Sequence, residues 1–224
     1  KRGVNRHGSV GVGINETVER CLISAFKTTV ADLFNLTVLF QKVVMYCMER
    51  LPRRLVSLGI MEIPERYKEI LESPNLIINW TEDIETLKKN ITLADDKVMR
   101  GKNIIFEGAQ GLLLDEKSRY FPHVTRSRTG LHNINELAKS AGIEHLDVTY
   151  ASRCYRTRHG AGDFPYEIGE KPYKNVVDLT NKPHEYQGNL RFGWLDLIEL
   201  AGAIDNDLGD AKDISVKPSL AITC

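Results

Sequence analysis

The segment best suited to chemistry is a short run of small residues that carries one carboxylate and one amide. Its sequence is FEGAQGLLLD, at residues 106–115, and it continues the apolar run 103–106, which predicts a strand. Small residues let a ligand approach the backbone closely. The amide of Gln110 can donate and accept hydrogen bonds at once, which suits the carbonyl edge of a purine. The spacing alone is equally typical of an ordinary junction between a strand and a turn.

Further segments contain residue types that bind anions and nucleotides. GSVGVG at residues 8–13 stands before a predicted helix, and backbone amides at such a turn form an anion site together with the helix N-terminus. It is not a Walker A motif, because no Lys-Ser or Lys-Thr pair follows. RTRHGAGDFP spans residues 156–165, and FGWLD spans residues 192–196. We interpret Asp196 as an acid at a helix N-terminus rather than as a catalyst.

Taken in order, FEGAQGLLLD, RTRHGAGDFP and FGWLD resemble the adenylosuccinate synthetase family, whose members join aspartate to IMP at the expense of GTP. The first is a signature of that family, and YFPHVT at residues 120–125 fits the family's Tyr-Pro-x-Val-Thr pattern. The resemblance covers the middle of the family's length. It implies that Gln110 faces the purine, that Leu114 lines its pocket and that Thr125 binds the nucleotide phosphate.

The resemblance implies substrate contacts from other loops as well. Ser9 stands near threonines that hold the 5′-phosphate of IMP in the family. Arg20 is either a solvated helix residue or the arginine that reaches the nucleotide phosphate of a neighbouring subunit, which implies a homodimer. His159 and Gly160 belong to the ribose-binding loop, where glycine lets the backbone approach the sugar. Because His159 replaces a valine, we favour a ribose contact or a packed, hydrogen-bonded residue over an acid or base.

The loop that holds aspartate in the family is altered here. The family has Thr-Thr-Gly-Arg-x-Arg-Arg, which places threonine hydroxyls and paired arginines on the two carboxylates. This chain has EYQGNLR at residues 185–191, so Asn189 and Arg191 are the remaining candidates for aspartate binding. In a second departure, Arg126 and Arg128 stand beside the expected phosphate contact, where they either strengthen anion binding or are surface charges.

Parts of the family's active centre are not found in this sequence. In the family, the catalytic aspartate and histidine, the stretch Gly-Asp-Glu-Gly-Lys-Gly and the magnesium site lie N-terminal to the matching residues. No catalytic or metal-binding residue is therefore assigned, and GTP and Mg²⁺ are implied by the family alone. The chain begins at Lys1 and stops within the strand-like run 219–224, so we interpret both ends as interruptions of a longer protein.

Strands that alternate with helices predict an α/β fold with a mainly parallel central sheet. The expected strands are 103–106, 146–150 and 220–223, and the expected helices are 134–141, ended by Gly142, and 196–204. Residues 15–100 are a predicted helical insertion, and residues 101–224 are the α/β part that binds nucleotide and aspartate. The resemblance implies that residues 1–224 are the central part of a single domain with the family's P-loop-like fold of a GTP-dependent ligase.

The composition is that of an ordinary globular protein, with 42% hydrophobic and 27% charged residues. The formal net charge is +0, so no global field favours nucleic acid or a membrane surface, and neither is an expected partner. No apolar run is long enough to span a bilayer. The four cysteines are scattered without metal-ligand spacing, which favours a reduced, cytoplasmic protein.

Three functions remain open at this point. The first is an adenylosuccinate synthetase that acts on IMP in purine nucleotide biosynthesis. The second is a relative of the phage-type enzymes that join aspartate to dGMP, because losing a cation near the sugar, around Asn189, would tolerate a deoxyribose. The third is a nucleotide-binding protein without ligase activity, which the loss of cations from the aspartate loop would allow.

Overall fold

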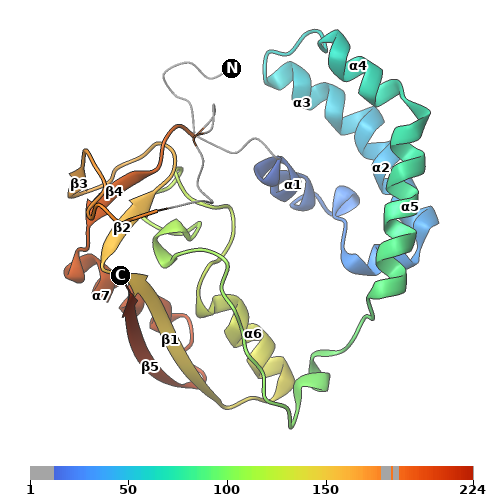
Figure 1. The fold of residues 1–224 in the computed structure, drawn as a ribbon. Coiled ribbons are helices and arrows are strands. Elements are labelled where there is room, and N and C mark those ends of the chain that lie inside the picture. Colours follow the sequence, from blue (N-terminus) through green and yellow to red (C-terminus); the bar gives the residue numbers. More distant parts are fainter. Residues whose placement is uncertain (1–12, 178–182, 184–186, 224) are drawn as a thin grey trace. The chain divides into compact units, whose positions relative to one another are not determined.

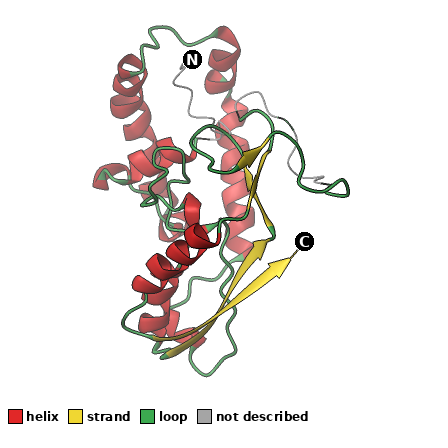
Figure 2. Ribbon diagram, turned by 90° about the vertical axis from the view of Figure 1, so that its left-hand side faces the viewer, coloured by secondary structure: helices red, strands yellow, loops and turns green. Residues whose placement is uncertain are grey.

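The computed structural model describes residues 13–177, 183 and 187–223 (Figure 1). They divide into two compact units, one formed by Asn15–Ala94 and the other by the rest of the described residues. The first unit has helices and no strand among its described residues, whereas the second has both helices and strands (Figure 2). Arg20 belongs to the first unit, and the Gln110 segment belongs to the second.

The first unit is built from helices and single turns. These are α1 (Ile14–Cys21), η2 (Ser24–Phe26), η3 (Val30–Phe34), α2 (Leu36–Met45), η4 (Tyr46–Arg50), α3 (Leu51–Ser57), α4 (Glu65–Glu72) and α5 (Pro74–Asn90). The π-turn η4 joins α2 to α3 directly before Pro52, whose ring suits the first turn of a helix and not its interior. Leu39 of α2 and Ile84 of α5 are buried, and the rings of Phe40 and Trp80 meet edge to face at 5.5 Å.

The second unit combines two small sheets with two helices. Its elements are η5 (Asp96–Met99), η6 (Leu112–Leu114), α6 (Leu131–Ala141), β1 (His145–Arg153), β2 (Tyr155–Arg158), β3 (Glu167–Ile168), β4 (Arg191–Trp194), α7 (Leu197–Gly209) and β5 (Ser215–Thr223). β1 and β5 lie side by side and pair in parallel, from His145 opposite Ser215 to Arg153 opposite Thr223 (Figure 1). The other sheet is antiparallel and has the order β2-β4-β3.

The α/β class is confirmed, but the parallel sheet is smaller than predicted. Among the described strands only β1 and β5 are parallel, and the predicted strands 146–150 and 220–223 lie within them. The predicted strand 103–106 is wrong for this structure, because it pairs with no described residue, and Ile105 is 94% exposed. A run of β-forming residues becomes a strand only where a partner accepts and donates its backbone hydrogen bonds.

Two predicted helix termini are confirmed. Gly142 follows α6 with a φ of 72°, in the left-handed region that glycine adopts without strain. Asp196 precedes α7, and its carboxylate accepts hydrogen bonds from the N–H groups of Ile198 at 2.9 Å and Glu199 at 3.1 Å. Asp196 is therefore a helix-capping acid.

A buried carboxylate from α7 caps the N-terminus of α6. Asp207 accepts hydrogen bonds from the N–H of Leu131 at 2.7 Å and from the hydroxyl of Tyr150 at 2.9 Å. Burial raises the pKa of Asp207, although both donors stabilise its charged form. Gly130 makes this approach possible, because a Cβ there would lie 1.8 Å from the Asp207 carboxylate. One side chain thus joins α6, α7 and β1.

We expect Gly130→Ala to destabilise the protein by about 1–3 kcal/mol, because the new methyl group overlaps the buried carboxylate. Urea unfolding of the full chain, followed by far-ultraviolet circular dichroism, measures this. The matched control is Gly202→Ala in α7, where a Cβ would meet nothing within 4 Å. That change should stabilise the helix by about 0.5–1 kcal/mol. Equal stability of the two variants would contradict the role given to Gly130.

Candidate functional site

The Gln110 segment lies against the segment that contains Thr125. The N–H of Thr125 donates to the carbonyl of Leu114 at 2.9 Å, and the N–H of Glu116 donates to the carbonyl of Ser127 at 3.0 Å. These two bonds form a short ladder between residues that are about ten positions apart in the chain. The structure therefore brings together Leu114 and Thr125, two of the residues predicted to contact a nucleotide.

Gln110 stands at an exposed bend just before η6. Its side chain makes no hydrogen bond to any residue that the structure describes. The oxygen and the nitrogen of its side-chain amide are therefore both available to a ligand. Gly108, two residues earlier, packs closely, since a Cβ there would lie 3.5 Å from the carbonyl oxygen of Thr129.

Asp115 fixes the end of this segment. Its carboxylate accepts hydrogen bonds from the N–H groups of Lys117 at 2.9 Å and Thr129 at 2.8 Å, and from Nε of Arg128 at 3.1 Å. Burial alone would raise the pKa of Asp115, but the two N–H groups and the Arg128 guanidinium together lower it below the usual range. Asp115 is therefore charged and structural at neutral pH.

The two extra arginines beside Thr125 are engaged with carboxylates of the protein. Arg128 binds Asp115 and, through Nη2, the carboxylate of Asp210. Its side chain is 12% exposed, so it joins the segment to the end of α7 rather than forming a solvated charge. Arg126 lies 3.9 Å from Glu116. The two roles predicted for these arginines are a stronger anion site and a surface charge. Arg128 has neither role in this structure.

The glycine loop at residues 160–162 closes onto the same region. Arg158, the last residue of β2, is buried and donates from Nη2 to the carbonyls of His123 at 2.8 Å and Ala161 at 3.0 Å. Gly162 has a φ of 105°, and a Cβ there would lie 2.5 Å from Nη2 of Arg158 and 2.7 Å from Cβ of His123. Arg158 thus holds the glycine loop against the segment that ends at Thr125.

His159 is partly buried at the start of this loop. Both ring nitrogens are enclosed, and neither has a hydrogen-bond partner among the described residues. An enclosed polar atom without a partner costs about 1–3 kcal/mol, which a ligand or a water molecule can offset. The His159 ring is thus packed without a hydrogen bond to a described residue, and its contact with a sugar stays a prediction.

Arg191, at the start of β4, is bound to the glycine loop and to Glu167. It donates to the Glu167 carboxylate from Nε at 2.8 Å and from Nη2 at 2.5 Å. Its Nη1 donates to the carbonyls of Gly160 at 3.1 Å and Gly162 at 2.9 Å. Asn189, the other residue predicted to bind aspartate, is exposed. The two residues thus lie beside the loop, but Arg191 already has a carboxylate partner.

Two further residues are predicted to contact the nucleotide. Ser9 lies outside the described residues. Arg20 is in the last turn of α1, in the other unit, and its guanidinium lies 5.9 Å from the ring centre of Tyr46. Its predicted contact with a neighbouring subunit stays a prediction.

Sequence reasoning missed the role of Glu199 in the first turn of α7. Its carboxylate is paired with Arg119 and with Arg156, each at 2.6 Å, and it accepts a hydrogen bond from the hydroxyl of Tyr120. The side chain of Glu199 is 7% exposed. This cluster ties α7 and β2 to the segment that leads to Thr125. Its partners are 43 to 80 positions away in the chain, and no motif marked them.

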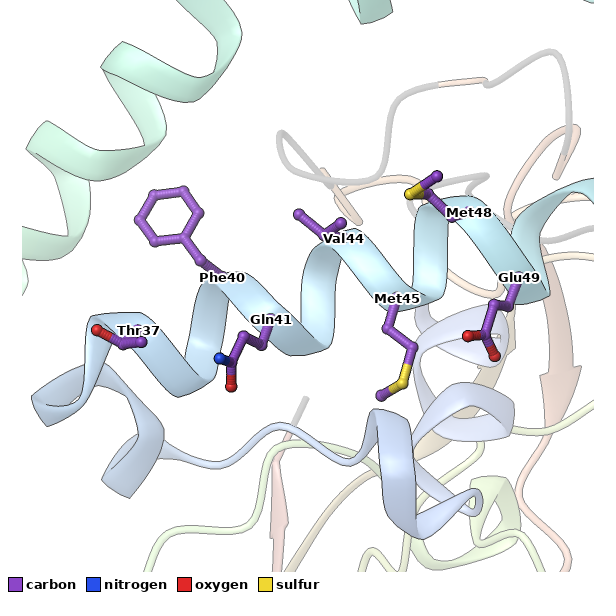
Figure 3. A pocket seen from close by; sticks show the side chains of 7 residues that line it. All are labelled: Thr37, Phe40, Gln41, Val44, Met45, Met48 and Glu49. Carbon is purple, nitrogen blue, oxygen red and sulfur yellow. The ribbon is translucent and has the colours of Figure 1, made fainter.

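The first unit has a groove of its own. It lies along α2 and η4, where Phe40, Val44 and Met48 project from the same side of the helix (Figure 3). It contains none of the residues that the sequence predicts to bind substrate.

The described residues do not fit a metal site. They contain no group of three or more histidine, cysteine, aspartate or glutamate side chains that could hold a metal ion. Mg²⁺ therefore stays a requirement that the family alone implies. No described helix is long and apolar enough to cross a membrane.

Comparison with known proteins finds one family. A profile of the family described as adenylosuccinate synthetase matches residues 1–211. The adenylosuccinate synthetase of Mesoplasma florum is 30% identical over 187 residues, which are 80% of this chain and 38% of that protein. That of Hamiltonella defensa is 31% identical over 215 residues, 91% of this chain and 46% of its own. The chain thus spans less than half the length of these curated relatives.

We expect Gly162→Ala to destabilise the protein by about 1–3 kcal/mol, because the new methyl group meets Arg158 and the left-handed backbone is strained. Urea unfolding measures the loss. Gly169→Ala is the matched control, since a Cβ there meets nothing within 4 Å and its φ is not positive. If Gly162→Ala were as stable as the control, the close packing of the loop on Arg158 would be refuted.

Asp115→Asn should reveal a pH-dependent contribution to stability. Because the pKa of Asp115 is lowered in the folded state, its stabilisation is present above the unfolded pKa of about 3.9 and is lost as pH falls through the folded pKa. We expect the substitution to cost about 1.5–3 kcal/mol at pH 7 and progressively less below pH ~4. Urea unfolding between pH 3 and pH 7 gives both values.

The control for this experiment is Asp213→Asn, which removes an exposed carboxylate paired with Lys139. We expect its effect on the free energy of unfolding at pH 7 to be much smaller than that of Asp115→Asn. A constant difference between Asp115→Asn and the unmodified protein across the pH range would contradict the assignment.

Proposed function

Because the chain belongs to the adenylosuccinate synthetase family, we propose that the protein joins L-aspartate to the 6-position of IMP with hydrolysis of GTP, in purine nucleotide biosynthesis. The observation that carries the proposal is the clustering of the residues that resemble the family's nucleotide pocket. Backbone hydrogen bonds join Leu114 to Thr125, and Arg158 joins the glycine loop to the same segment. These contacts join the glycine loop to the segments around Leu114 and Thr125, which supports one shared site.

Each part of this site has a task in nucleotide binding. The exposed amide of Gln110 can donate to and accept from the purine edge at the 6-oxygen. The hydroxyl of Thr125 can donate to a phosphate oxygen. The backbone at Gly160 can approach the ribose, where a side chain would block it. A contact between the His159 ring and the sugar would require its enclosed ring nitrogens to become accessible.

The other substrates are supported by the family alone. In this family GTP would supply the phosphoryl group that activates the 6-oxygen of IMP, and Mg²⁺ would neutralise the phosphate charge. The tasks that we propose for the described residues are to bind and orient the nucleotide. Arg20 would act on the nucleotide of a second subunit, which makes a homodimer part of the proposal.

Two alternatives follow from the loop before β4. Asn189 is exposed and uncharged where the family has an arginine, and this favours a protein that accepts dGMP in place of IMP. The same loss of charge, together with the engagement of Arg191 by Glu167, favours a protein that binds a nucleotide without ligating it. Neither alternative changes the tasks assigned to Gln110 and Thr125.

Phosphate release separates the three functions. The full-length protein is incubated with GTP, Mg²⁺ and aspartate, and with either IMP or dGMP. Release that depends on IMP and aspartate supports the proposal. Release that depends on dGMP and aspartate, with none in the presence of IMP, supports the first alternative. If neither nucleotide gives turnover but calorimetry detects IMP binding, the binding protein is the correct description. Absence of both turnover and binding would refute all three.

We expect Gln110→Ala to lower kcat/KM for IMP roughly 100-fold or more, because a site built to hydrogen-bond its substrate loses that contact at the reacting edge. The matched control is Gln41→Ala, which removes an exposed glutamine from α2 and should leave kcat/KM within a factor of two. Activity of Gln110→Ala equal to that of the control would show that the 106–115 loop has been wrongly assigned.

A further inference from the structure

Two arginines face each other directly across the antiparallel sheet. In the register of β2 and β4, Arg158 is the cross-strand partner of Arg191. Like charges at such positions repel each other, and here burial and the neighbouring Arg191 lower the pKa of Arg158. The pair can therefore persist only where other groups compensate both guanidinium charges.

The compensating groups include the three successive carbonyls of the glycine loop, the carbonyl of His123 and one carboxylate. Arg191 donates to the carbonyls of Gly160 and Gly162, at 3.1 and 2.9 Å. Arg158 donates to the carbonyl between them, that of Ala161, at 3.0 Å. Glu167 forms a bidentate pair with Arg191. Each of the three carbonyls of the loop thus accepts a hydrogen bond from one of the two arginines.

This arrangement fixes the direction of the loop's N–H groups. In a trans peptide the N–H points opposite to the C=O of the same peptide plane. The N–H groups of Ala161, Gly162 and Asp163 therefore point away from the two guanidinium groups. None of the three donates to another described residue. Positive φ angles at Gly160 and Gly162 permit such a row of N–H groups, which is a form of backbone that binds anionic or hydroxyl oxygens.

We propose that Arg191 is a positioning residue, which is held by Glu167 and shapes the glycine loop for the nucleotide, and that it does not clamp the carboxylates of the amino acid. The proposal rests on the proposed function, because it assigns the row of N–H groups to the sugar or phosphate oxygens of the same nucleotide. It replaces the role in aspartate binding that the sequence alone suggests for Arg191.

The bonding of Arg191 supports this role. Glu167 occupies Nε and Nη2, the edge of the guanidinium that suits a bidentate carboxylate, and the two carbonyls occupy Nη1. The ring of Phe164, which is buried, lies under the guanidinium at 5.4 Å from its centre. A substrate carboxylate would have to displace Glu167, whose pKa Arg191 holds below its usual range.

Glu167→Gln distinguishes the two roles by how it changes the KM for IMP and the KM for aspartate. If Arg191 positions the loop, weakening its partner should raise the KM for IMP about 5- to 10-fold and leave the KM for aspartate within twofold. If Arg191 clamps aspartate, removal of a competing carboxylate should lower the KM for aspartate. The second outcome would overturn the proposal.

Trypsin cleavage tests the positioning role without any substrate. The peptide bond between Arg158 and His159 is protected from trypsin because Arg158 and the glycine loop hold each other in place. Arg191→Ala removes one of the side chains that hold this loop, so we expect trypsin to cleave the bond about tenfold faster in the full chain, as detected by mass spectrometry. Lys212→Ala, which removes an exposed cation at the end of α7, should not change the cleavage rate. Unchanged cleavage in Arg191→Ala would overturn the proposal.

The two tests separate the proposal from the proposed function. Faster cleavage in Arg191→Ala, together with a protein that binds no IMP by calorimetry, would retain the role of Arg191 in shaping the loop and remove the nucleotide as its ligand. IMP binding weakened about 5- to 10-fold in Arg191→Lys, with faster cleavage, would support both.

Discussion

The repulsion between Arg158 and Arg191 is the constraint on which the candidate site depends. The two residues are directly opposite each other in β2 and β4, so each needs a compensating partner within reach. The glycine loop supplies three carbonyls and β3 supplies Glu167. A loop that must turn its carbonyls toward two cations necessarily turns its N–H groups away from them. The direction of the potential ligand contacts is thus set by charge compensation within the sheet.

Buried carboxylates hold the rest of the second unit together. Asp207 joins two helices to β1, Asp115 closes the Gln110 segment, and Glu199 ties α7 to Tyr120 and Arg156. Contacts of Asp207 and Glu199 join residues that are 76 to 80 positions apart. Each carboxylate accepts bonds from backbone N–H groups or from cations, which offsets the cost of burying its charge. The unit therefore relies on polar joints as well as on its apolar core.

The sequence predicts features that depend on neighbouring residues and misses features that depend on residues far away in the chain. The end of α6 at Gly142 and the capping role of Asp196 follow from rules that involve a few neighbouring residues, and both are confirmed. The strand at 103–106 is wrong because strand formation depends on a partner, which propensity does not reveal.

The candidate site shows the same division. The motif at 106–115 identifies the family, which the matching profile confirms, because the motif lies within one short stretch of sequence. The carboxylate partners of Arg191 and Arg128 could not be predicted, since Glu167 and Asp210 lie 24 and 82 positions away.

A direct test of the nucleotide pocket is photo-crosslinking of the full-length protein with 6-thio-IMP, whose sulfur replaces the purine 6-oxygen. The expected crosslink lies in the tryptic peptide 103–117, which contains Gln110, and IMP should compete it away. A crosslink elsewhere, or one that IMP does not reduce, would contradict the assignment of the nucleotide pocket.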